Sequence, residues 1–456
     1  MLSSTSTLLA DGLQGRVIEP GHPDYDEART VFNAAVDRRP AAIVKVANAN
    51  DVARVITHAR ERSLELAVRS GGHSGAGHGV TDGGIVLDLS EMRALEIDPE
   101  RRTAWAETGL TAGEYTAEAG RHGLATGFGD TGTVGIGGIT LSGGVGFLSR
   151  KQGLTIDELL AAEVVTADGD LLYVDGETHE DLFWAIRGGG GNFGVATRFK
   201  FRLHPVEPFV GGILFLPATP EVVAGFAAEA AVAPEELSTI ANVMTAPPLP
   251  FLPEELHGKL VLMAMVAYAG EVEDGERAIA PLRALAEPVA DMVRPMSYPE
   301  MYPPEEEEFR PIAAVRTMFA DSVGLGAAET IIERIQASRA MTSVTQIRVL
   351  GGAVARVPAD ATAYAHRRSR IMMNVAALYQ NPEERPVHQE WVNGLADELL
   401  QDDAGAYVGF LADEGEERVR AAYPGPTWDR LREVKRRYDP HNVFRLNQNI
   451  PPAEES

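Results

Sequence analysis

Residues 68–75 read Val-Arg-Ser-Gly-Gly-His-Ser-Gly and continue a short apolar run that starts at Leu66. An apolar run that ends in glycines predicts a strand leading into a tight loop. Glycine in this number indicates backbone that approaches another group closely, because no Cβ stands in the way. His73, at the centre, is open to two interpretations. It is a surface histidine in a flexible loop, or an imidazole at a phosphate-binding turn whose neutral nitrogen can bond to a reactive cofactor carbon.

A second glycine-rich stretch, residues 127–153, interleaves ten glycines with apolar side chains. Val134, Ile136 and Leu141 require burial, which excludes a solvated linker. The spacing suits neither a regular strand nor a regular helix. We therefore expect irregular, buried backbone that lies against a flat ligand, where side chains would be in the way.

Three separated segments, 69–75, 135–146 and 188–194, can each present consecutive N–H groups to phosphate oxygens. None is followed by the Gly-Lys-Ser/Thr of a Walker A loop. None has a Gly-x-Gly-x-x-Gly pattern between a strand and a helix, as a Rossmann-type NAD site requires. The arrangement favours an elongated cofactor with a pyrophosphate in its middle.

Strands and helices alternate in the first part of the chain. Apolar periodicity predicts helices at 48–63, 112–122 and 179–187, and strands at 42–47, 66–68, 85–89, 103–108, 159–167, 171–174 and 195–203. Composition changes after Pro205 and Pro208, where glycine becomes rarer. From there we expect helices at 221–233, 271–287 and 325–339, and strands at 211–216, 258–268, 343–350 and 370–379.

The predicted fold class is α+β, with three segments along the chain. Residues 1–206 form the first domain, and 207–404 form an inserted domain in which helices cover an antiparallel sheet. Residues 405–456 return to the first domain, because an amphipathic helix and a dense polar motif reappear there.

Charge and cysteine content limit the function classes. The net charge is −25, from 66 acidic and 41 basic residues, which argues against binding to nucleic acid or to an anionic membrane. The chain has no cysteine, which excludes disulfides and thiolate chemistry, and no metal site is indicated. The N-terminus lacks the features of a signal peptide, and no apolar run is long enough to span a membrane. We expect a cytoplasmic monomer or homodimer that acts on a small molecule.

Eight motifs in order along the chain carry a family resemblance. They are Arg69-Ser-Gly-Gly-His73-Ser, Ile85-Val-Leu-Asp-Leu-Ser90, Thr133-Val-Gly-Ile-Gly-Gly138, Ser142-Gly-Gly-Val-Gly146, Lys151-Gln-Gly-Leu-Thr-Ile-Asp157, Leu182-Phe-Trp-Ala-Ile-Arg-Gly-Gly-Gly190, Asn192-Phe-Gly-Val195 and Tyr438-Asp-Pro-His-Asn-Val-Phe-Arg-Leu-Asn-Gln-Asn-Ile450. Together they resemble the berberine bridge enzyme-like branch of the vanillyl-alcohol oxidase flavoprotein superfamily. The resemblance covers residues 40–206 and 405–451, and the middle of the chain only in general pattern.

The resemblance implies a PCMH-type FAD-binding domain whose FAD is bonded through its 8α-methyl carbon to His73. It also implies that the sheet of the inserted domain covers the isoalloxazine ring. The cofactor-binding residues implied in this way are Arg69, Ser70, Gly71, Gly72, His73, Ser74, Thr133, Val134, Gly137, Gly138, Ser142, Gly143, Gly146, Gly194, Val195 and Asn447.

Two positions depart from the family pattern. Thr131 stands where many members carry a cysteine with a second covalent link, so we expect a single link. We interpret Tyr407-Val-Gly-Phe410 as a strand, in which phenylalanine occupies the position of the usual tyrosine base. Phenylalanine cannot accept a proton.

Three residues are candidates for a replacement catalytic group: Gln346, Arg348 and Tyr379. Period-two alternation places Gln346 and Arg348 on one face of the 343–350 strand. The alternative interpretations are that Arg348 lies on a solvent-facing surface and that Tyr379 only packs in the core.

The resemblance implies hydride transfer from a small alcohol, phenolic compound or amine to FAD, with reoxidation by O2 to H2O2. Val134 favours an oxidase, since a small side chain at this position is associated with oxygen access in relatives. Phe410 shifts the expectation from sugars toward acidic phenolic or amine-like substrates. The alternatives are a dehydrogenase with another electron acceptor and a flavin-retaining protein with little turnover.

Overall fold

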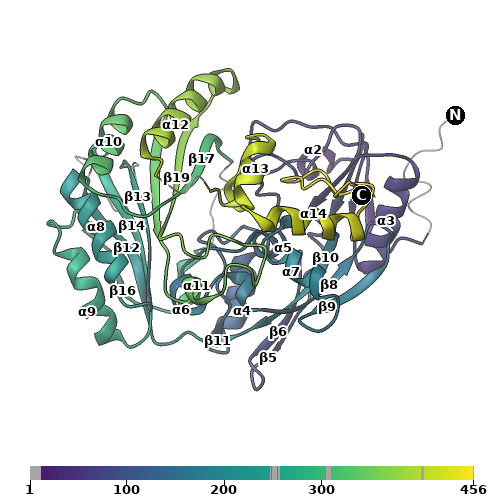
Figure 1. Cartoon of the computed structure of the whole chain (residues 1–456), viewed down its shortest axis with the longest axis horizontal. Helices are drawn as coiled ribbons and strands as arrows, with labels where there is room; N and C mark the ends of the chain where they lie inside the picture. Colours follow the sequence, from purple (N-terminus) through teal and green to yellow (C-terminus); the bar gives the residue numbers. More distant parts are fainter. Residues whose placement is uncertain are drawn as a thin grey trace.

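The computed structural model describes residues 12–246, 248, 254, 257–303, 310–401 and 405–454. Figure 1 shows two lobes side by side. The first lobe combines the start of the chain with its end, and the second is formed by the middle of the chain.

Two sheets form the first lobe. The smaller has the order β1-β2-β4-β3, in which β2 and β3 run parallel to β4. The larger is antiparallel, in the order β5-β6-β10-β8-β9. The strands are β1 (Arg16–Ile18), β2 (Ala42–Lys45), β3 (Leu66–Arg69), β4 (Ile85–Asp88), β5 (Leu95–Asp98), β6 (Thr103–Glu107), β8 (Leu159–Val165), β9 (Leu171–Asp175) and β10 (Val195–Arg202), with a separate short pair of β7 (Leu124–Ala125) and β11 (His204–Pro205).

Helices and the C-terminal segment cover these sheets. In α3 (Ala49–Glu61) the buried Val52, Val55 and Ile56 face the core, and the Asn48 side chain caps the first turn. The last helix, α14 (Pro426–Tyr438), buries Leu431 and Val434 in the core that contains β8 and β10. The other helices of this lobe are α2 (Tyr25–Ala28), α4 (Ala112–Gly120), α5 (Ile136–Ser142), α6 (Ser149–Gln152), α7 (Glu180–Ile186) and α13 (Glu416–Ala422).

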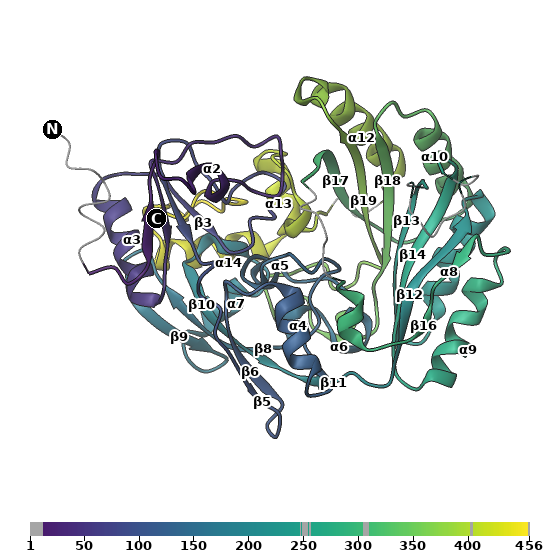
Figure 2. The same cartoon turned by 180° about the vertical axis from the view of Figure 1, so that it is seen from behind.

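The second lobe is one antiparallel sheet with helices on one face (Figures 1 and 2). The strand order is β15-β12-β14-β13-β18-β19-β17, and β16 also pairs with β12. The strands are β12 (Phe209–Pro217), β13 (Leu237–Thr245), β14 (Leu260–Ala269), β15 (Ala290–Asp291), β16 (Arg294–Pro295), β17 (Ile312–Ala320), β18 (Thr342–Val349) and β19 (Ile371–Tyr379). The helices are α8 (Pro220–Val232), α9 (Val272–Arg283), α10 (Leu325–Gln336) and α12 (Arg385–Leu399), and a short α11 (Ala353–Arg356) lies near α6.

Alternation along the strands separates the two faces of this sheet. Ile347 and Val349 of β18 belong to the core under the helices, as do Met373 and Val375 of β19. Their neighbours Gln346, Arg348 and Asn374 therefore lie on the opposite face, which is turned toward the first lobe.

Buried arginines join the lobes. Arg150 of α6 donates hydrogen bonds to the carbonyl oxygens of Ala230, Ala233 and Leu237, at 2.6, 2.8 and 3.0 Å. These carbonyls lie at the end of α8 and at the start of β13. Arg367 makes two 2.7 Å contacts with the carboxylate of Asp157. These charge-assisted hydrogen bonds fix the relative position of the two lobes.

The α+β fold and the antiparallel second sheet confirm the predicted fold class, but several local predictions were wrong. The glycine-rich stretch expected to be irregular contains α5. The Tyr407–Phe410 segment expected to be a strand contains a 3₁₀ turn, Val408–Phe410. Strands β13 and β17 and helix α12 were missed. The domain boundary expected at residue 404 falls outside the described residues.

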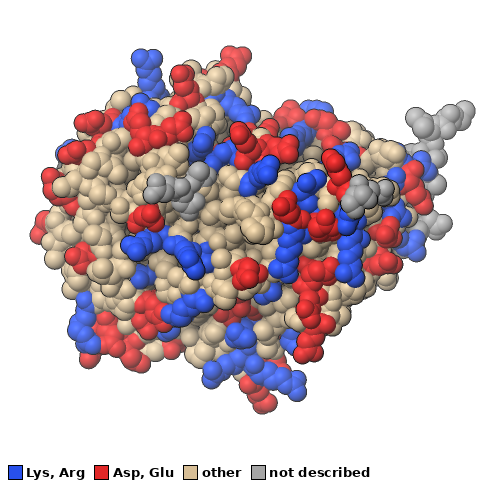
Figure 3. All heavy atoms as spheres, viewed as in Figure 1, with Lys and Arg blue, Asp and Glu red and all other residues tan. Residues whose placement is uncertain are grey.

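The surface carries charges of both signs. Basic and acidic side chains are interspersed over the face in Figure 3. No described helix has the length and apolar character needed to cross a membrane.

Candidate cofactor and substrate site

A cavity of about 470 Å³ lies where the two lobes meet, within the usual size of a small-molecule site. The glycine-rich segments of the first lobe form one wall, here called the floor: residues 68–75, 129–145 and 190–196. Side chains from β17 and β19 and residues 407–411 form the opposite wall, here called the roof. Residues 444–448 of the C-terminal segment close one end.

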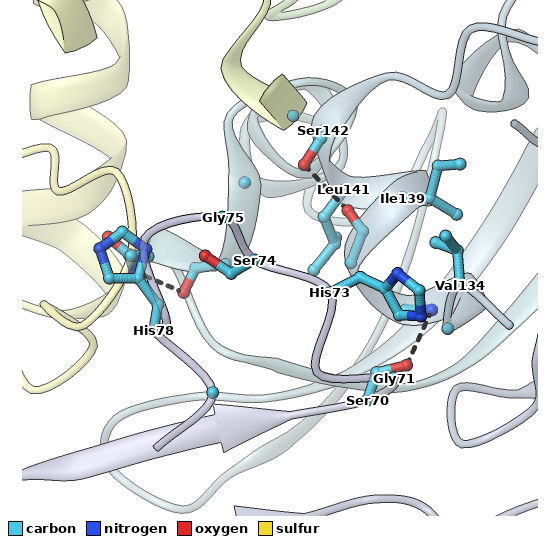
Figure 4. A pocket seen from close by; sticks show the side chains of 18 of the residues that line it. Ser70, Gly71, His73, Ser74, Gly75, His78, Val134, Ile139, Leu141 and Ser142 are labelled. Carbon is cyan, nitrogen blue, oxygen red and sulfur yellow. Dashed lines mark hydrogen bonds between the residues drawn. The ribbon is translucent and has the colours of Figure 1, made fainter. Parts of the chain in front are cut away.

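His73 lies at the turn of its loop (Figure 4). Two contacts hold its ring. The Phe32 ring stacks on it, with centroids 4.4 Å apart and planes 20° apart. A hydrogen bond joins the imidazole to the backbone of Thr133. Burial lowers the pKa of His73 to about 4, against the smaller, opposite effect of the bond to Thr133. The imidazole is therefore neutral at physiological pH, the form in which one ring nitrogen has a free lone pair.

The floor depends on close contact between two glycine segments. A Cβ on Gly71 or on Gly135 would lie 2.3 Å from the backbone nitrogen of the other residue. Ser70 reinforces this contact, because its Oγ donates to the Thr108 carbonyl at 2.6 Å and accepts from Gly137 N–H at 3.3 Å (Figure 4). The His73 loop and the start of α5 are thus packed backbone to backbone.

Other glycines leave room toward the cavity. A Cβ added to Gly138 or Gly191 would meet no protein atom within 4 Å, and both residues line the cavity. The side-chain oxygen of Asn447, which also lines it, is buried without a hydrogen-bond partner among the described residues. These features fit a flat, elongated ligand with polar groups, as FAD is.

Thirteen of the sixteen predicted cofactor residues line this cavity: Arg69, Ser70, Gly71, Gly72, His73, Ser74, Val134, Gly137, Gly138, Ser142, Gly194, Val195 and Asn447. The other three do not. Thr133 contributes its backbone bond to His73. A Cβ on Gly143 would lie 3.3 Å from the rings of Tyr364 and Tyr407, and one on Gly146 would lie 1.7 Å from the Phe128 carbonyl. Those two glycines are required by packing rather than by the cavity.

Arg348 is buried between the lobes, so the interpretation that it faces solvent was wrong. Its Nη2 donates to Asp130 at 2.7 Å, its Nη1 to the Val145 carbonyl at 3.2 Å, and its Nε to Gln346 Oε1 at 2.7 Å. Gln346 Nε2 in turn donates to Asn242 Oδ1 at 3.0 Å. Gln346 and Arg348 therefore act together, but neither lines the cavity. Asp130, which belongs to the same hydrogen-bond network, does line the cavity.

Tyr379 lies outside the site. Its side chain is in the core on the helix-covered face of the sheet, and its ring stacks on His388 of α12 at 4.7 Å. Alternation along β19 explains the placement, since Tyr379 shares a face with Met373 and Val375. The prediction that Tyr379 is a catalytic residue was wrong, and the alternative interpretation, that Tyr379 packs in the core, is the one that the structure supports.

Two aromatic residues line the roof where a base was sought. Phe410 has the guanidinium of Arg348 5.0 Å from its ring centre. The Tyr407 hydroxyl accepts the N–H of Gly144 at 3.0 Å. Burial raises the pKa of Tyr407, which makes its phenol a poor proton acceptor or donor at neutral pH.

Several cavity residues were not predicted from the sequence, among them the polar Asn374, Asp130 and His78. Asn374 pairs in register with Gln346, and its Oδ1 has no hydrogen-bond partner within the described part of the chain. Period-two alternation on the predicted 370–379 strand could have placed it. Burial lowers the pKa of His78 to about 4. No sequence pattern pointed to Asp130, because its role depends on Arg348, which lies 218 residues further along the chain.

A buried ion pair holds the C-terminal end of the cavity. Lys435 and Asp439 are fully buried, 2.7 Å apart. Lys435 also donates to the carbonyls of Asn192 and Phe444, and Asp439 accepts the N–H groups of Val443 and Phe444. These bonds fix the segment that leads to Asn447.

Comparisons with known proteins agree with this site. Residues 40–175 match the family model described as FAD binding domain, and residues 406–451 match the one described as berberine and berberine like. The FAD-linked oxidoreductase YvdP of Bacillus subtilis is 33% identical, over 97% of this chain and 99% of that protein. The (R)-6-hydroxynicotine oxidase of Paenarthrobacter nicotinovorans is 32% identical, over 99% of both chains.

A solved structure matches over the same range. The crystal structure of 6-hydroxy-D-nicotine oxidase from Arthrobacter nicotinovorans has a TM-score of 0.84 and 28% identity, covering 97% of this chain and 98% of that one. The residues matched by the two family models include those that form much of the floor and the C-terminal end of the cavity. The relatives match along nearly the whole chain. The chain therefore belongs to the berberine bridge enzyme-like FAD-linked oxidoreductases of the PCMH-type FAD-binding superfamily.

Proposed function

We propose that this chain is an oxidase that removes hydride from a C–H bond beside an amine nitrogen, with FAD held by a single covalent link through His73. Bound FAD accepts the hydride and passes its electrons to O2, which gives H2O2. Residues 1–206 and 405–456 hold the cofactor, and residues 207–404 cover the substrate.

The observation that carries the proposal concerns tyrosine: among the described residues that line the cavity, no tyrosine offers a hydroxyl without a protein partner. Phe410 presents a ring to the cavity, and the hydroxyl of Tyr407 is bound to Gly144 N–H. An alcohol must lose its hydroxyl proton to become a carbonyl, which requires a base. A neutral amine needs no base to lose a hydride, because the lone pair of its nitrogen stabilises the cation that forms. A cavity without that hydroxyl therefore suits an amine better.

Polar groups on both walls support an amine as the substrate. The Oδ1 of Asn374 is available as an acceptor for a substrate N–H. Asp130 adds a carboxylate to the cavity lining, although Arg348 neutralises it. In addition, the relative named (R)-6-hydroxynicotine oxidase is named for an amine substrate.

Two features of the floor support a single link and the use of oxygen. The neutral, oriented imidazole of His73 has the lone pair that a link to a flavin carbon requires. Thr131, which lines the cavity, offers a hydroxyl, and the chain has no cysteine for a second link. Val134 also lines the cavity, and its small side chain leaves space for O2 in the way that the family resemblance implies.

The test compares matched substrates under anaerobic conditions. N-methylbenzylamine, benzyl alcohol and a disaccharide are mixed in turn with the enzyme, and loss of the visible flavin band is followed. We expect the amine to reduce the flavin at least about tenfold faster than the alcohol, the lower range of an acid–base contribution. Equal rates for amine and alcohol would contradict the amine assignment. Slow reoxidation after admission of O2 would favour a dehydrogenase, and no reduction by any compound would favour a flavin-retaining protein with little turnover.

A further inference from the structure

Residues 28–38, here called the brace, lie along the whole His73 loop. The side chain of Arg69, at the start of the loop, donates to the carbonyls of Ala28 and Thr30. Phe32 N–H donates to the Gly72 carbonyl at 3.1 Å, and Asn33 Nδ2 donates to the Gly75 carbonyl at 2.8 Å. Arg38 donates to the carbonyls of Gly77 and Val80, both at 2.9 Å. Brace and loop are therefore hydrogen-bonded from one end to the other.

The brace is also fixed to the second lobe. Ala34 N–H donates to the Pro311 carbonyl at 3.3 Å, and Arg310 Nε donates to the Val31 carbonyl at 3.0 Å. Pro311 immediately precedes β17 and lines the cavity. The brace thus contacts the loop on one side and the edge strand of the roof on the other.

His73 needs such support because its own neighbours provide little. Gly71, Gly72 and Gly75 surround it, and Gly72 has a φ of +72°, a conformation that glycine adopts without strain. Such backbone does not orient an imidazole. Two contacts do: the stacked Phe32 ring sets the plane of the imidazole, and the Thr133 backbone sets its rotation within that plane. The bond to Thr133 also fixes which nitrogen carries the proton.

We propose that Phe32 is a positioning residue for the covalent attachment of FAD, because its ring holds the His73 imidazole in the orientation from which it reacts. The proposal rests on the proposed link through His73. In the reaction a ring nitrogen of His73 forms a bond to the 8α carbon, and one C–H bond of the methyl group breaks. The imidazole N–H proton is lost as well. These two protons and the two electrons released reach O2 as H2O2, which balances the step.

The test separates binding of FAD from its attachment. The full chain is purified from riboflavin-starved cells and mixed with FAD in the presence of O2. Protein-bound flavin is measured by gel filtration, and covalent flavin by its persistence in the acid-precipitated protein. F32L and F32M remove the stacked ring but keep an apolar side chain, whereas F32Y keeps the ring. F319L is the matched control, because Phe319 stacks on His366 in the same way, at 4.5 Å and 25°, without lining the cavity.

We expect F32L and F32M to bind FAD as the wild type does but to attach it about fivefold more slowly, as expected for loss of one aromatic pair. F32Y and F319L should attach it at the wild-type rate. Attachment at the wild-type rate in F32L and F32M would overturn the positioning role, as would equal slowing in F319L. A wild-type chain whose flavin is released entirely by acid would overturn the His73 link itself, and the proposal with it.

Discussion

The two walls of the cavity are built in different ways. The floor is backbone: glycines in three short segments, with one imidazole among them. The polar network behind the roof is made of side chains, in which Asn242, Gln346 and Arg348 come from two strands and reach Asp130 across the lobe boundary. The floor can therefore hold a ligand common to a whole family, while single substitutions can change the roof. This difference predicts that cofactor chemistry depends on the floor and substrate choice on the roof.

The strongest test of the floor is His73→Ala. We expect complete loss of covalent flavin, while FAD still binds, because the glycine contacts that form the floor do not involve the imidazole. The measurement is the flavin colour of acid-precipitated protein. His78→Ala is the control, because His78 is a second cavity histidine with a lowered pKa, at the other end of the loop (Figure 4). Covalent flavin in His73→Ala, or its loss in His78→Ala, would contradict the assignment.

On the roof side, the largest effect is expected from Arg348→Met. The substitution leaves the partly buried Asp130 carboxylate without its partner, at a cost of about 2 to 3 kcal/mol in the free energy of unfolding. Urea unfolding measures this change. Adding Asp130→Asn removes the unpaired charge, so the double variant should recover part of the loss. If the double variant loses the sum of both single effects, the two residues do not interact as the structure indicates.

Phe410→Tyr tests whether the roof determines substrate choice. A phenol at this position provides the hydroxyl group that the Phe410 ring lacks, and the nearby guanidinium of Arg348 favours its ionised form. We expect the rate of anaerobic flavin reduction by benzyl alcohol to rise about tenfold and that by the amine to change little. Phe410→Leu should remain at the wild-type level for the alcohol. An unchanged alcohol rate in Phe410→Tyr would show that another property of the roof excludes alcohols.

A smaller effect concerns pH and His78. Burial lowers its pKa from 6.5 to about 4 in the folded chain. Between these values the unfolded chain binds a proton at this histidine that the folded chain does not bind, so stability falls as pH decreases from about 6.5 to about 4 and is unaffected above that range. Urea unfolding at several pH values should therefore show a weaker pH dependence in His78→Ala than in the wild type. An unchanged dependence would mean that His78 titrates normally in the folded chain.

The same contrast explains what the sequence could predict. The floor depends on backbone contacts whose requirement for glycine is local, so thirteen of sixteen predicted cofactor residues line the cavity. Gly143 and Gly146 do not line the cavity. The sequence could not separate them from the others, because the need for glycine is the same whether the close neighbour is a ligand or, as here, Tyr407 and the Phe128 carbonyl.

The roof was predicted less well, for a physical reason. Alternation on the 343–350 strand correctly placed Gln346 and Arg348 on one face of the sheet. Alternation alone does not determine which of the two faces is turned toward the cavity. The burial of Arg348 depends on Asp130 and Val145, which the first lobe supplies. Strand β17 carries Ala313 and Val315 of the roof and was missed.

The smallest effect is expected from Tyr379→Phe, which tests the placement of the two faces directly. Two tyrosines differ in their surroundings: Tyr407 lines the roof of the cavity, whereas Tyr379 stacks on His388 under α12. Removal of the Tyr379 hydroxyl keeps the stacked ring, so the rate of flavin reduction by the amine should stay within about twofold of the wild type, and the free energy of unfolding within about 1 kcal/mol. Anaerobic stopped-flow and urea unfolding measure the two quantities. A large fall in the reduction rate with unchanged stability would mean that the Tyr379 hydroxyl reaches the substrate. Such a result would require β19 to present its odd-numbered residues to the cavity, which would remove Asn374 from the roof and reverse the assignment of the two faces.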